Sequence, residues 1–509
     1  MPYPLPVTRH YIEVLGRQVH YRRRGRGAPV VLLHESPRSS AALLPLMEFG
    51  SDQVTMLALD TPGCGDSDPL PLTRPDAGDY ADAVAATLDA LGIGRAAVYG
   101  THTGAAIGMA LATRHPERVS TLVIDGLGVF EAAERAQLLQ SYLPAFVPLA
   151  DGTHLAWLWA RIRDQFTFFP WNHRGTGARL WRELPPAASL HQVALDLLRA
   201  GDHYRAPYAA AFRYQAEQAL PFLSMPTHLC ARADDMLQPH LARLHTLPTQ
   251  VHIEQLSAQR PVWGARIWAL LCQGLTGLPD APSASAAPLP AEKLGNSFVG
   301  APGERLHLRG ATGGRGLPLL LLHDSPGAGQ TLDEQARQWL GLRPILMPDL
   351  PCHGESDVFP DLDGLAGLVL ALHHRLRHTG LDKAELAGVG TGSVVARALA
   401  ATHPRHYFLP TGAEKAADRW MFPQALCDLS FAPRADGGHL QAAWFHARDR
   451  YILGPTWQRS SEKRHDFGDD LDVPLIHRHA LDYLKEGPQA PNLRAALVGQ
   501  ALAWRASRA

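Results

Sequence analysis

Short strings of residues occur twice in this chain, in the same order and at a nearly constant separation. The separation is 289 residues for the first two strings and between 285 and 288 for the later ones. Such self-similarity predicts a duplicated domain. The paired strings are VVLLHESP (Val30–Pro37) with LLLLHDSP (Leu319–Pro326), LDTPGCGDSD from Leu59 with PDLPCHGESD from Pro348, GTHTG from Gly100 with GVGTG from Gly388, ADGTHL from Ala150 with ADGGHL from Ala435, and ALDLL from Ala194 with ALDYL from Ala480.

The length of the chain agrees with two domains, because 509 residues exceed what one ordinary hydrophobic core organises. Residues 279–295 are rich in Pro, Ala and Ser and predict a linker. We therefore predict a first domain over residues 1–278 and a second over 296–509. By the separation of the repeats, Ala509 corresponds to a position near residue 223 of the first copy. The second copy is therefore truncated and is expected to lack the last strands.

Within each copy, short apolar runs bounded by Gly or Pro alternate with helical stretches. This alternation is typical of βαβ units and predicts an α/β fold with a mainly parallel sheet flanked by helices. In the first copy the predicted strands are VVLLH, TMLALD, AAVYG and TLVID. A helix is predicted over Ala105–Arg114, ending at HPERV.

The charge balance excludes several classes of partner. With 48 basic and 49 acidic residues the chain has no overall attraction to nucleic acid or anionic lipid. The absence of a secretory signal or membrane-length apolar run favours the cytoplasm. The five cysteines are widely spaced without a CxxC pair, which favours a reducing compartment and no zinc cluster. A small molecule is the expected partner, and homo-oligomerisation is left open.

The order of these motifs resembles the α/β-hydrolase superfamily: a strand, a His-containing turn, a DxPGxGxSD-type loop, a strand, a G-x-x-x-G turn, a helix and HPERV. The resemblance covers nearly the whole chain, twice. It implies a helical cap in each copy, predicted over residues 127–222 in the first. The aromatic residues of that segment either belong to a core or form an apolar ligand chamber: Trp157, Trp159, Phe166, Phe168, Phe169 and Trp171.

The resemblance also implies a nucleophile on a sharp turn between strand and helix, flanked by glycines because no Cβ fits there. His102 takes this position in the first copy and Gly390 in the second. The usual serine is missing from both. Because glycine has no side chain that attacks or carries a proton, the second copy is predicted to be non-catalytic. The stretch expected to supply the catalytic histidine reads LSAQRP, Leu256–Pro261, and contains none.

The family's catalytic acid is expected after the strand in Met225–Met236, at Asp234 or Asp235, with Asp125 as a second candidate. Because an imidazole reaches further than a serine hydroxyl, we predict a dyad in which His102 meets Asp234 directly. The carboxylate would fix the ring tautomer and raise its basicity. Water or a substrate proton would be the target.

A carboxylate replaces the glycine of the family's usual His-Gly pair, since the first copy reads His34, Glu35. Its charge opposes a developing oxyanion and disfavours a plain esterase. Glu35 and His102 together would suit proton abstraction and return, or attack by water with general-acid help. Asp324 repeats Glu35 in the second copy, so a structural role for both is an alternative.

Further residues are predicted to contact the substrate: His34, Thr101, Thr103 and Arg260. Arg260 either holds a substrate carboxylate or pairs with a surface acid. His154 and the equivalent His439 are predicted to be structural, and no metal site or cofactor is expected.

Taken together, these features predict a non-canonical hydrolase or lyase of a small carbonyl compound, with His102 as general base or nucleophile. The alternative is a catalytically inactive pair of domains that binds a small ligand or a protein partner. A catalytic Ser36 is a third, weaker hypothesis, because Ser325 repeats it in the second copy.

Overall fold

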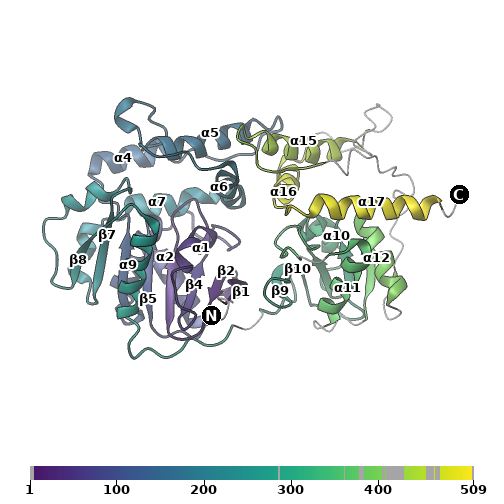
Figure 1. Cartoon of the computed structure of the whole chain (residues 1–509), viewed down its shortest axis with the longest axis horizontal. Helices are drawn as coiled ribbons and strands as arrows, with labels where there is room; N and C mark the ends of the chain where they lie inside the picture. Colours follow the sequence, from purple (N-terminus) through teal and green to yellow (C-terminus); the bar gives the residue numbers. More distant parts are fainter. Residues whose placement is uncertain are drawn as a thin grey trace. The chain divides into compact units, whose positions relative to one another are not determined.

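We describe the protein from a computed structural model of the chain (Figure 1). The structure describes residues 5–284, 287–359, 362–377, 383–403, 407–408, 429–453, 464 and 470–506. Contacts divide the chain into unit 1, Met1–Val147 and Leu158–Ser285, and unit 2, Pro148–Trp157 and Ala286–Ala509. The predicted cap over 127–222 thus contains a short segment, Pro148–Trp157, that groups with unit 2.

Unit 1 contains an eight-stranded mixed sheet in the order β1-β2-β4-β3-β5-β6-β7-β8. Strands β1, β2 and β4 pair antiparallel, and β3 to β8 pair parallel with their neighbours. The central strands β3 to β6 are almost entirely buried, as parallel strands covered on both faces are. The strands are β1 Thr8–Val14, β2 Arg17–Arg24, β3 Pro29–Leu33, β4 Thr55–Leu59, β5 Ala96–Thr101, β6 Val119–Asp125, β7 Thr227–Arg232 and β8 Val251–Leu256.

Helices cover both faces of this sheet. One hydrophobic core joins α2 and α3 to the sheet, and another joins α1 and α9 to its opposite face. Helices α4 to α8 all come between β6 and β7 in the chain, and α4 and α7 are drawn above the sheet in Figure 1. The helices are α1 Leu44–Met47, α2 Ala77–Ala90, α3 Thr103–Arg114, α4 Ala132–Ser141, α5 Thr153–Thr167, α6 Ala187–Ala200, α7 Arg205–Arg213, α8 Ala216–Ala219 and α9 Arg260–Gln273.

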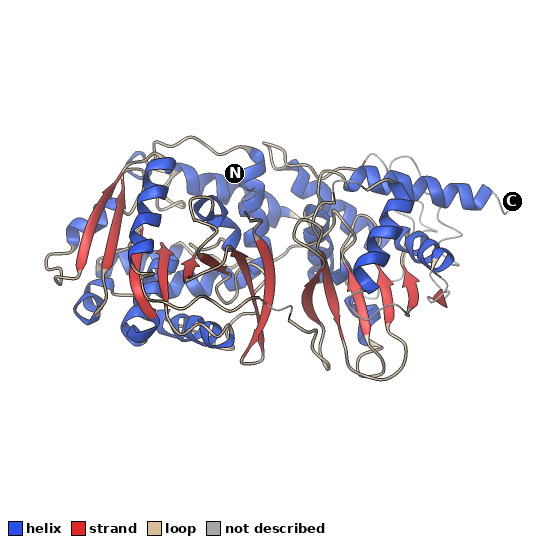
Figure 2. Cartoon of the chain, turned by 60° about the horizontal axis from the view of Figure 1, so that its bottom comes forward, coloured by secondary structure: helices blue, strands red, loops and turns tan. Residues whose placement is uncertain are grey.

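Unit 2 contains a second, six-stranded sheet (Figure 2). Its order, β9-β10-β12-β11-β13-β14, repeats that of the first six strands of unit 1, with the same antiparallel and parallel pairs. The residues described after β14 form helices and no strand. The strands are β9 Gly295–Val299, β10 Leu306–Ala311, β11 Leu319–Leu322, β12 Ile345–Pro348, β13 Glu385–Gly388 and β14 Tyr407–Phe408. The helices are α10 Asp333–Arg337, α11 Gly364–Leu376, α12 Thr391–Thr402, α15 Gly438–Ile452, α16 Val473–Leu484 and α17 Ala490–Ala506.

The turn from β5 to α3 is packed too tightly for side chains at its glycines. A Cβ on Gly100 would lie 2.2 Å from the carbonyl oxygen of Gly104, and one on Gly104 would lie 2.2 Å from that of Leu33. The equivalent turn of unit 2 has the same constraint at Gly388 and Gly392. Since both obstacles in unit 1 are backbone atoms, these positions require glycine.

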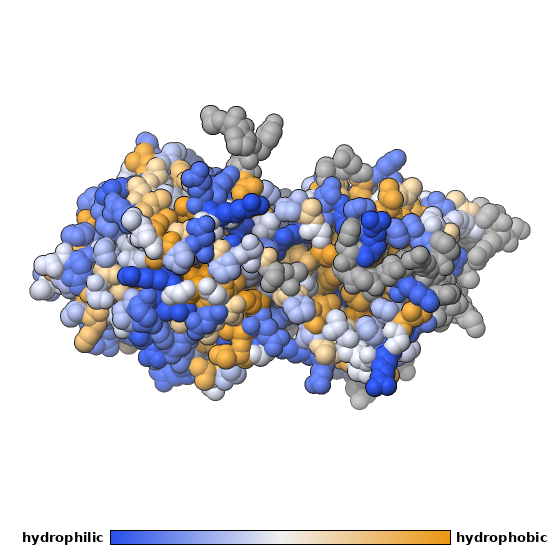
Figure 3. All heavy atoms as spheres, turned by 90° about the horizontal axis from the view of Figure 1, so that it is seen from below, coloured by the Kyte–Doolittle hydropathy of each residue, from blue (hydrophilic) through white to orange (hydrophobic). Residues whose placement is uncertain are grey.

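Hydrophilic side chains cover much of the face seen in Figure 3, with smaller hydrophobic patches among them. Among the helices that the structure describes, none has both the length and the apolar character needed to cross a bilayer.

Two glycines of α3 provide a test of the tight turn. Gly104→Ala should destabilise unit 1 by roughly 2–4 kcal/mol, because the new methyl group meets the backbone of β3. Gly108→Ala is the matched control: its Cβ would meet only side-chain atoms, at 3.5 Å or more. Alanine there should stabilise the helix by up to about 1 kcal/mol. Chemical denaturation would measure both, and equal effects would contradict the packing argument.

Candidate functional site

His102 lies between the end of β5 and the start of α3, with φ 50° and ψ −105°. A non-glycine residue in this region costs on the order of 1–2 kcal/mol of backbone strain, and such strain clusters at functional sites. Gly126, after β6, makes room for the ring: a Cβ there would lie 2.3 Å from Cδ2 of His102. The fold therefore holds an imidazole in a costly position and clears space beside it.

The ring of His102 is paired with Asp235. Nε2 of His102 lies 2.7 Å from Oδ2 of Asp235, whose other oxygen accepts a hydrogen bond from the Leu237 amide at 2.8 Å. Arg232 donates to the same Oδ2 at 3.1 Å. Asp235 is 2% exposed in its side chain, so this carboxylate is fixed from three sides.

The predicted pairing of His102 with Asp234 is therefore corrected to Asp235. The side chain of Asp234 is 41% exposed and its nearest ion-pair partner is Arg232, at 3.9 Å. The two acids are adjacent in sequence, and the turn after β7 directs the second one inward, where its amide bonds the carbonyl of Arg232. The sequence identified both acids as candidates, but nothing in it indicated which of the two carboxylates points toward His102.

Asp125, the other candidate acid, contacts Arg232 and the backbone of His102, and its carboxylate makes no hydrogen bond to the imidazole ring. Its carboxylate accepts from the Tyr99 hydroxyl at 2.9 Å and lies 3.2 Å from Nε of Arg232. Its main-chain carbonyl accepts from the amide of His102 at 2.9 Å. Asp125 thus helps to position both Arg232 and His102, a role for which the sequence offered no pattern.

Charges around His102 set its basicity. Burial alone would lower the pKa of the imidazole, but the charge and hydrogen bond of Asp235, together with the charges of Glu35 and Asp125, outweigh it, and the pKa of His102 lies above its ordinary value. Burial works against ionisation of Asp235 too, yet His102 and Arg232 hold the pKa of Asp235 well below its usual range. Because an ionised Asp235 accepts the hydrogen bond from Nε2–H, the free lone pair of a neutral ring is on Nδ1.

Glu35 is charged and directed to Arg38. Their side chains approach to 3.7 Å, and Arg38 also donates to Asp196 at 2.9 Å. Burial favours the neutral acid, but Arg38, a backbone hydrogen bond and His102 keep the pKa of Glu35 below its ordinary value. Glu35 therefore carries a negative charge at neutral pH and is not a resting proton donor. Arg38, three residues along the chain, is a partner that sequence reasoning missed.

His34 holds the backbone and does not line the cavity. Its Nδ1 donates to the carbonyl of Glu35 at 2.8 Å, and its Nε2 accepts from the amide of Thr61 at 3.1 Å. The side chain is fully buried. His323 of unit 2 makes the same two kinds of bond. The prediction that His34 contacts the substrate therefore gives way to a structural role.

A cavity of about 360 Å³ in unit 1 is lined by His102, Asp235 and Glu35. Thr101, Thr103 and Arg260, predicted to be near the substrate, line it as well. Arg260 lies 3.4 Å from Glu48, and both side chains are more than half exposed. Aromatic rings form much of the remaining wall, two of them from the predicted aromatic set: Phe130, Tyr142, Phe166, Phe169 and Phe212. The cavity thus combines an apolar chamber with one cluster of titratable groups.

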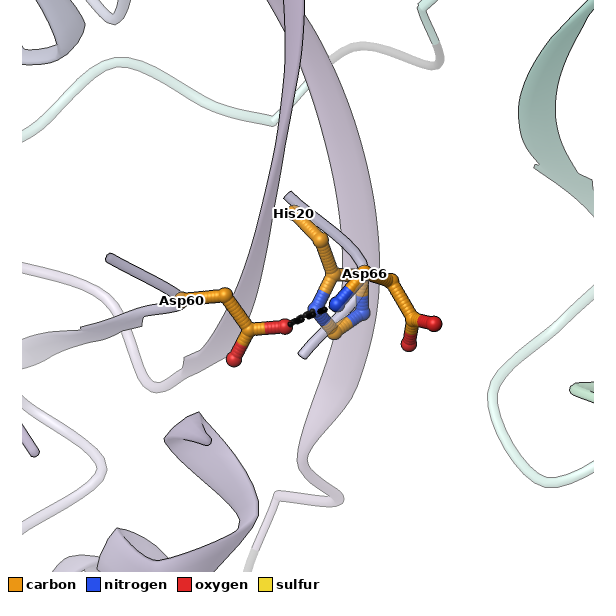
Figure 4. Close-up of side chains that lie close together, drawn as sticks. All are labelled: His20, Asp60 and Asp66. Atoms are coloured by element: carbon orange, nitrogen blue, oxygen red, sulfur yellow. Dashed lines mark hydrogen bonds and ion pairs between the residues drawn. The ribbon is translucent and has the colours of Figure 1, made fainter. Parts of the chain in front are cut away.

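The side chains of His20, Asp60 and Asp66 lie close together in a group that could hold a metal ion (Figure 4). None of the three lines the cavity. Both oxygens of Asp60 are already occupied: Oδ2 by Nδ1 of His20 at 2.8 Å and by the Asp66 amide at 2.9 Å, and Oδ1 by the Ser40 amide at 2.6 Å. In unit 2, Asp349 repeats the pattern with His307, Glu355 and Gly329. These pairs therefore brace a loop in each unit.

The two ADGxHL strings form the same small turn. Nδ1 of His154 accepts from the Leu149 amide at 3.1 Å, and Nδ1 of His439 accepts from the Arg434 amide at 3.1 Å. Each ring therefore satisfies a backbone donor five residues earlier, consistent with the structural role that was predicted for both.

Comparison with known proteins places unit 1 in a broad fold group. Residues 29–168 match the family model described as alpha/beta hydrolase fold. The cis-3-alkyl-4-alkyloxetan-2-one decarboxylase of Shewanella oneidensis is 33% identical over 142 residues, 26% of this chain and 43% of that protein. The 2-hydroxymuconate semialdehyde hydrolase of Pseudomonas putida is 34% identical over 132 residues, 25% of this chain and 45% of that protein. The first unit therefore has an α/β-hydrolase fold.

Each of these matches is partial. The chain spans less than half the length of the curated relatives it matches. The haloalkane dehalogenase of Sphingobium indicum is 35% identical over 126 residues, 24% of this chain and 41% of that protein. The solved epoxide hydrolase A of Mycobacterium thermoresistibile is 19% identical, covers 53% of this chain and 99% of its own, and has a TM-score of 0.42.

The ionisation of His102 offers a direct test of the pair. Histidine-selective NMR should show the His102 ring titrating above 6.5, its ordinary value, because Asp235 stabilises the imidazolium. Asp235→Asn removes that charge, and the midpoint of the His102 titration should fall. A His102 midpoint that does not respond to Asp235→Asn would contradict the pairing.

Proposed function

We propose that unit 1 is an enzyme that cleaves a small carbonyl compound, by hydrolysis of an ester, lactone, amide or C–C bond or by a related lyase reaction. His102 acts as the general base and Asp235 orients it. The observation that carries the proposal is the 2.7 Å contact between Nε2 of His102 and Asp235, at a strained turn that faces the cavity. A ring fixed by a carboxylate is the usual arrangement of a histidine base.

The orientation of the hydrogen bond between His102 and Asp235 supports a role of His102 as a base more than as a nucleophile. Asp235 accepts the hydrogen bond from Nε2–H, so Nδ1 of the neutral ring is left to accept a proton from water or from substrate. The raised pKa of His102 increases its strength as a proton acceptor. The named activities of the relatives, a decarboxylase, a dehalogenase and a hydrolase, support bond cleavage as the general class. They do not select the bond, because one fold hosts many reactions.

In the proposed reaction, Glu35 acts through its negative charge and does not donate a proton. Its negative charge, offset by Arg38, lies on the cavity wall with His102. It stabilises the imidazolium that forms when His102 accepts a proton, and it opposes negative charge on a nearby substrate oxygen. Proton transfer to His102 is therefore favoured over build-up of an isolated oxyanion.

We also propose that unit 2 is a non-catalytic copy of unit 1. The repeated strand order and the repeated turn support duplication, since Gly390 has φ 55° and ψ −126° where His102 has φ 50° and ψ −105°. Without a side chain on Gly390, the second turn holds no group that transfers a proton.

Turnover on a panel of esters, lactones and β-diketones tests the proposal. His102→Ala should lower the rate by roughly 10²–10⁴-fold on any substrate that is turned over, the contribution typical of a positioned general base. Asp235→Asn should lower it by a comparable factor with little effect on KM, because the ring loses its orientation. His252→Ala, on an exposed part of β8, is the control and should retain full activity. Unchanged turnover in His102→Ala would rule out the proposed base.

A second candidate function is ligand binding without turnover. The charged Glu35 favours it, since a carboxylate on the cavity wall hinders ordinary acyl transfer. In that case the substrate panel gives no turnover, and a ligand raises the melting temperature of wild type and of His102→Ala alike. Loss of the ligand effect in His102→Ala would speak against a merely passive cavity.

A further inference from the structure

One aspartate of the repeated ALDLL and ALDYL strings is buried in both units, but its hydrogen bonds differ between them. In unit 1 this residue is Asp196, on α6. Its Oδ2 accepts a hydrogen bond from Nε of Arg38 at 2.9 Å, and its Oδ1 accepts one from the hydroxyl of Ser39 at 2.7 Å. Both donors belong to the loop after β3. Each oxygen of this carboxylate therefore has a partner, which offsets the cost of taking the charge out of water.

The equivalent residue of unit 2 is Asp482, on α16, and the loop after β11 does not supply such donors. At the positions of the arginine and the serine, that loop has Gly327 and Ala328, which have no side-chain donor. Oδ1 of Asp482 lies 3.4 Å from Nζ of Lys485. Oδ2 is buried and has no hydrogen-bond partner among the described residues, in a side chain that is 1% exposed. A buried carboxylate oxygen is thus left without the donor that its counterpart in unit 1 has.

Two further acids face Asp482, and one lysine is shared with them. Asp349 and Glu355, at the end of β12 and in the loop after it, act on Asp482 by their negative charge. Lys485 lies 3.4 Å from Glu355, the same distance as from Asp482. His307 is directed to Asp349, at 2.9 Å. Ionisation of Asp482 therefore adds a negative charge beside two other carboxylates.

Two other elements pack against α16, and neither directs a counter-charge to Asp482. Helix α15 carries Arg450, which donates to Asp324 at 2.7 Å, and His446, whose ring lies against an aromatic ring of α16. The 3₁₀ helix η7 (Gly329–Leu332) contains no charged residue. The ionised form of Asp482 is therefore poorly compensated.

Burial raises the pKa of Asp482 to about 6, and Asp349 and Glu355 add to this rise while Lys485 opposes it. In the unfolded chain the carboxyl has its ordinary pKa of 3.8. The folded chain therefore binds this proton more tightly than the unfolded chain does. It follows that the contribution of Asp482 to stability is largest below about pH 4 and falls as the pH rises through about 6.

We propose that Asp482 is a proton-operated switch in unit 2: when protonated it packs as a neutral side chain against η7 and the loop after β12, and when ionised it loosens α16 from them. The switch works between mildly acidic and neutral solution. It does not depend on the proposed reaction, because neither Asp482 nor its neighbours line the cavity of unit 1.

Carboxyl-carbon NMR of the full chain, labelled with ¹³C in its aspartate side chains, tests the proton binding directly. One resonance should titrate near pH 6 in wild type and be missing in Asp482→Asn. Ala328→Ser restores the hydroxyl that Ser39 provides in unit 1, and it should lower this midpoint, because a hydrogen bond to the carboxylate stabilises the charged form. An Asp482 midpoint near the ordinary 3.8 would overturn the proposal, and so would a folded Ala328→Ser with an unchanged midpoint.

The switch also predicts that Asp482→Asn stabilises unit 2 increasingly as the pH rises. Hydrogen exchange of α16 peptides in the full chain, measured by mass spectrometry across a urea series, reports the unfolding of this helix. The ratio of its unfolding constants, wild type over variant, should rise roughly fiftyfold between about pH 4 and pH 7. A ratio that stays constant with pH would contradict the switch, whatever the asparagine itself does to the helix.

Asp196→Asn is the matched change in unit 1. It should destabilise unit 1 at pH 7, because it removes the charge that holds Arg38. The same substitution thus has opposite effects at neutral pH in the two units. Stabilisation by Asp196→Asn as well would show that the missing donors of unit 2 are not the cause, and would overturn the proposal.

Discussion

The close approach of the β5–α3 turn to strand β3 is the constraint on which the site depends. With backbone carbonyls 2.2 Å from where a Cβ would be, Gly100 and Gly104 leave the chain only one path from strand to helix. On this path His102 has a positive φ, which costs a non-glycine residue energy. The first amides of the helix have no acceptor within the helix itself. A side chain at position 102 and the donors of Thr103 are therefore brought together by backbone packing alone.

The charged groups around this turn differ between the two units. In unit 1 the turn carries an imidazole, and the charges of Asp235, Arg232 and Asp125 alternate behind it. In unit 2 the turn carries no side chain, and Asp324 supplies an anion that Arg450 neutralises. In both, a buried charge is paired and hydrogen-bonded, as its removal from water requires. One backbone thus supports a titratable cavity in unit 1 and a closed ion pair in unit 2.

Much of the fold near the site followed from local patterns. The predicted runs VVLLH, TMLALD, AAVYG and TLVID correspond to β3 to β6, and the helix predicted from Ala105 begins two residues earlier, at Thr103. Apolar runs between glycines and prolines are strong signals because they reflect burial along the strand itself. Side-chain direction is a weaker signal. Asp234 and Asp235 are chemically identical neighbours, and only the turn after β7 decides which one reaches His102.

The sequence by itself predicted two related segments with one order of strands and turns, with His102 at the turn of the first and Gly390 at the turn of the second. These are properties of residue type and spacing, which local chemistry dictates. Only the tertiary structure decided that Asp235 steadies the ring, that Arg38 keeps Glu35 ionised and that His34 braces a loop. Those contacts join segments that are far apart in the chain. A small change in the orientation of one loop would change which charged side chains lie within hydrogen-bond distance of each other.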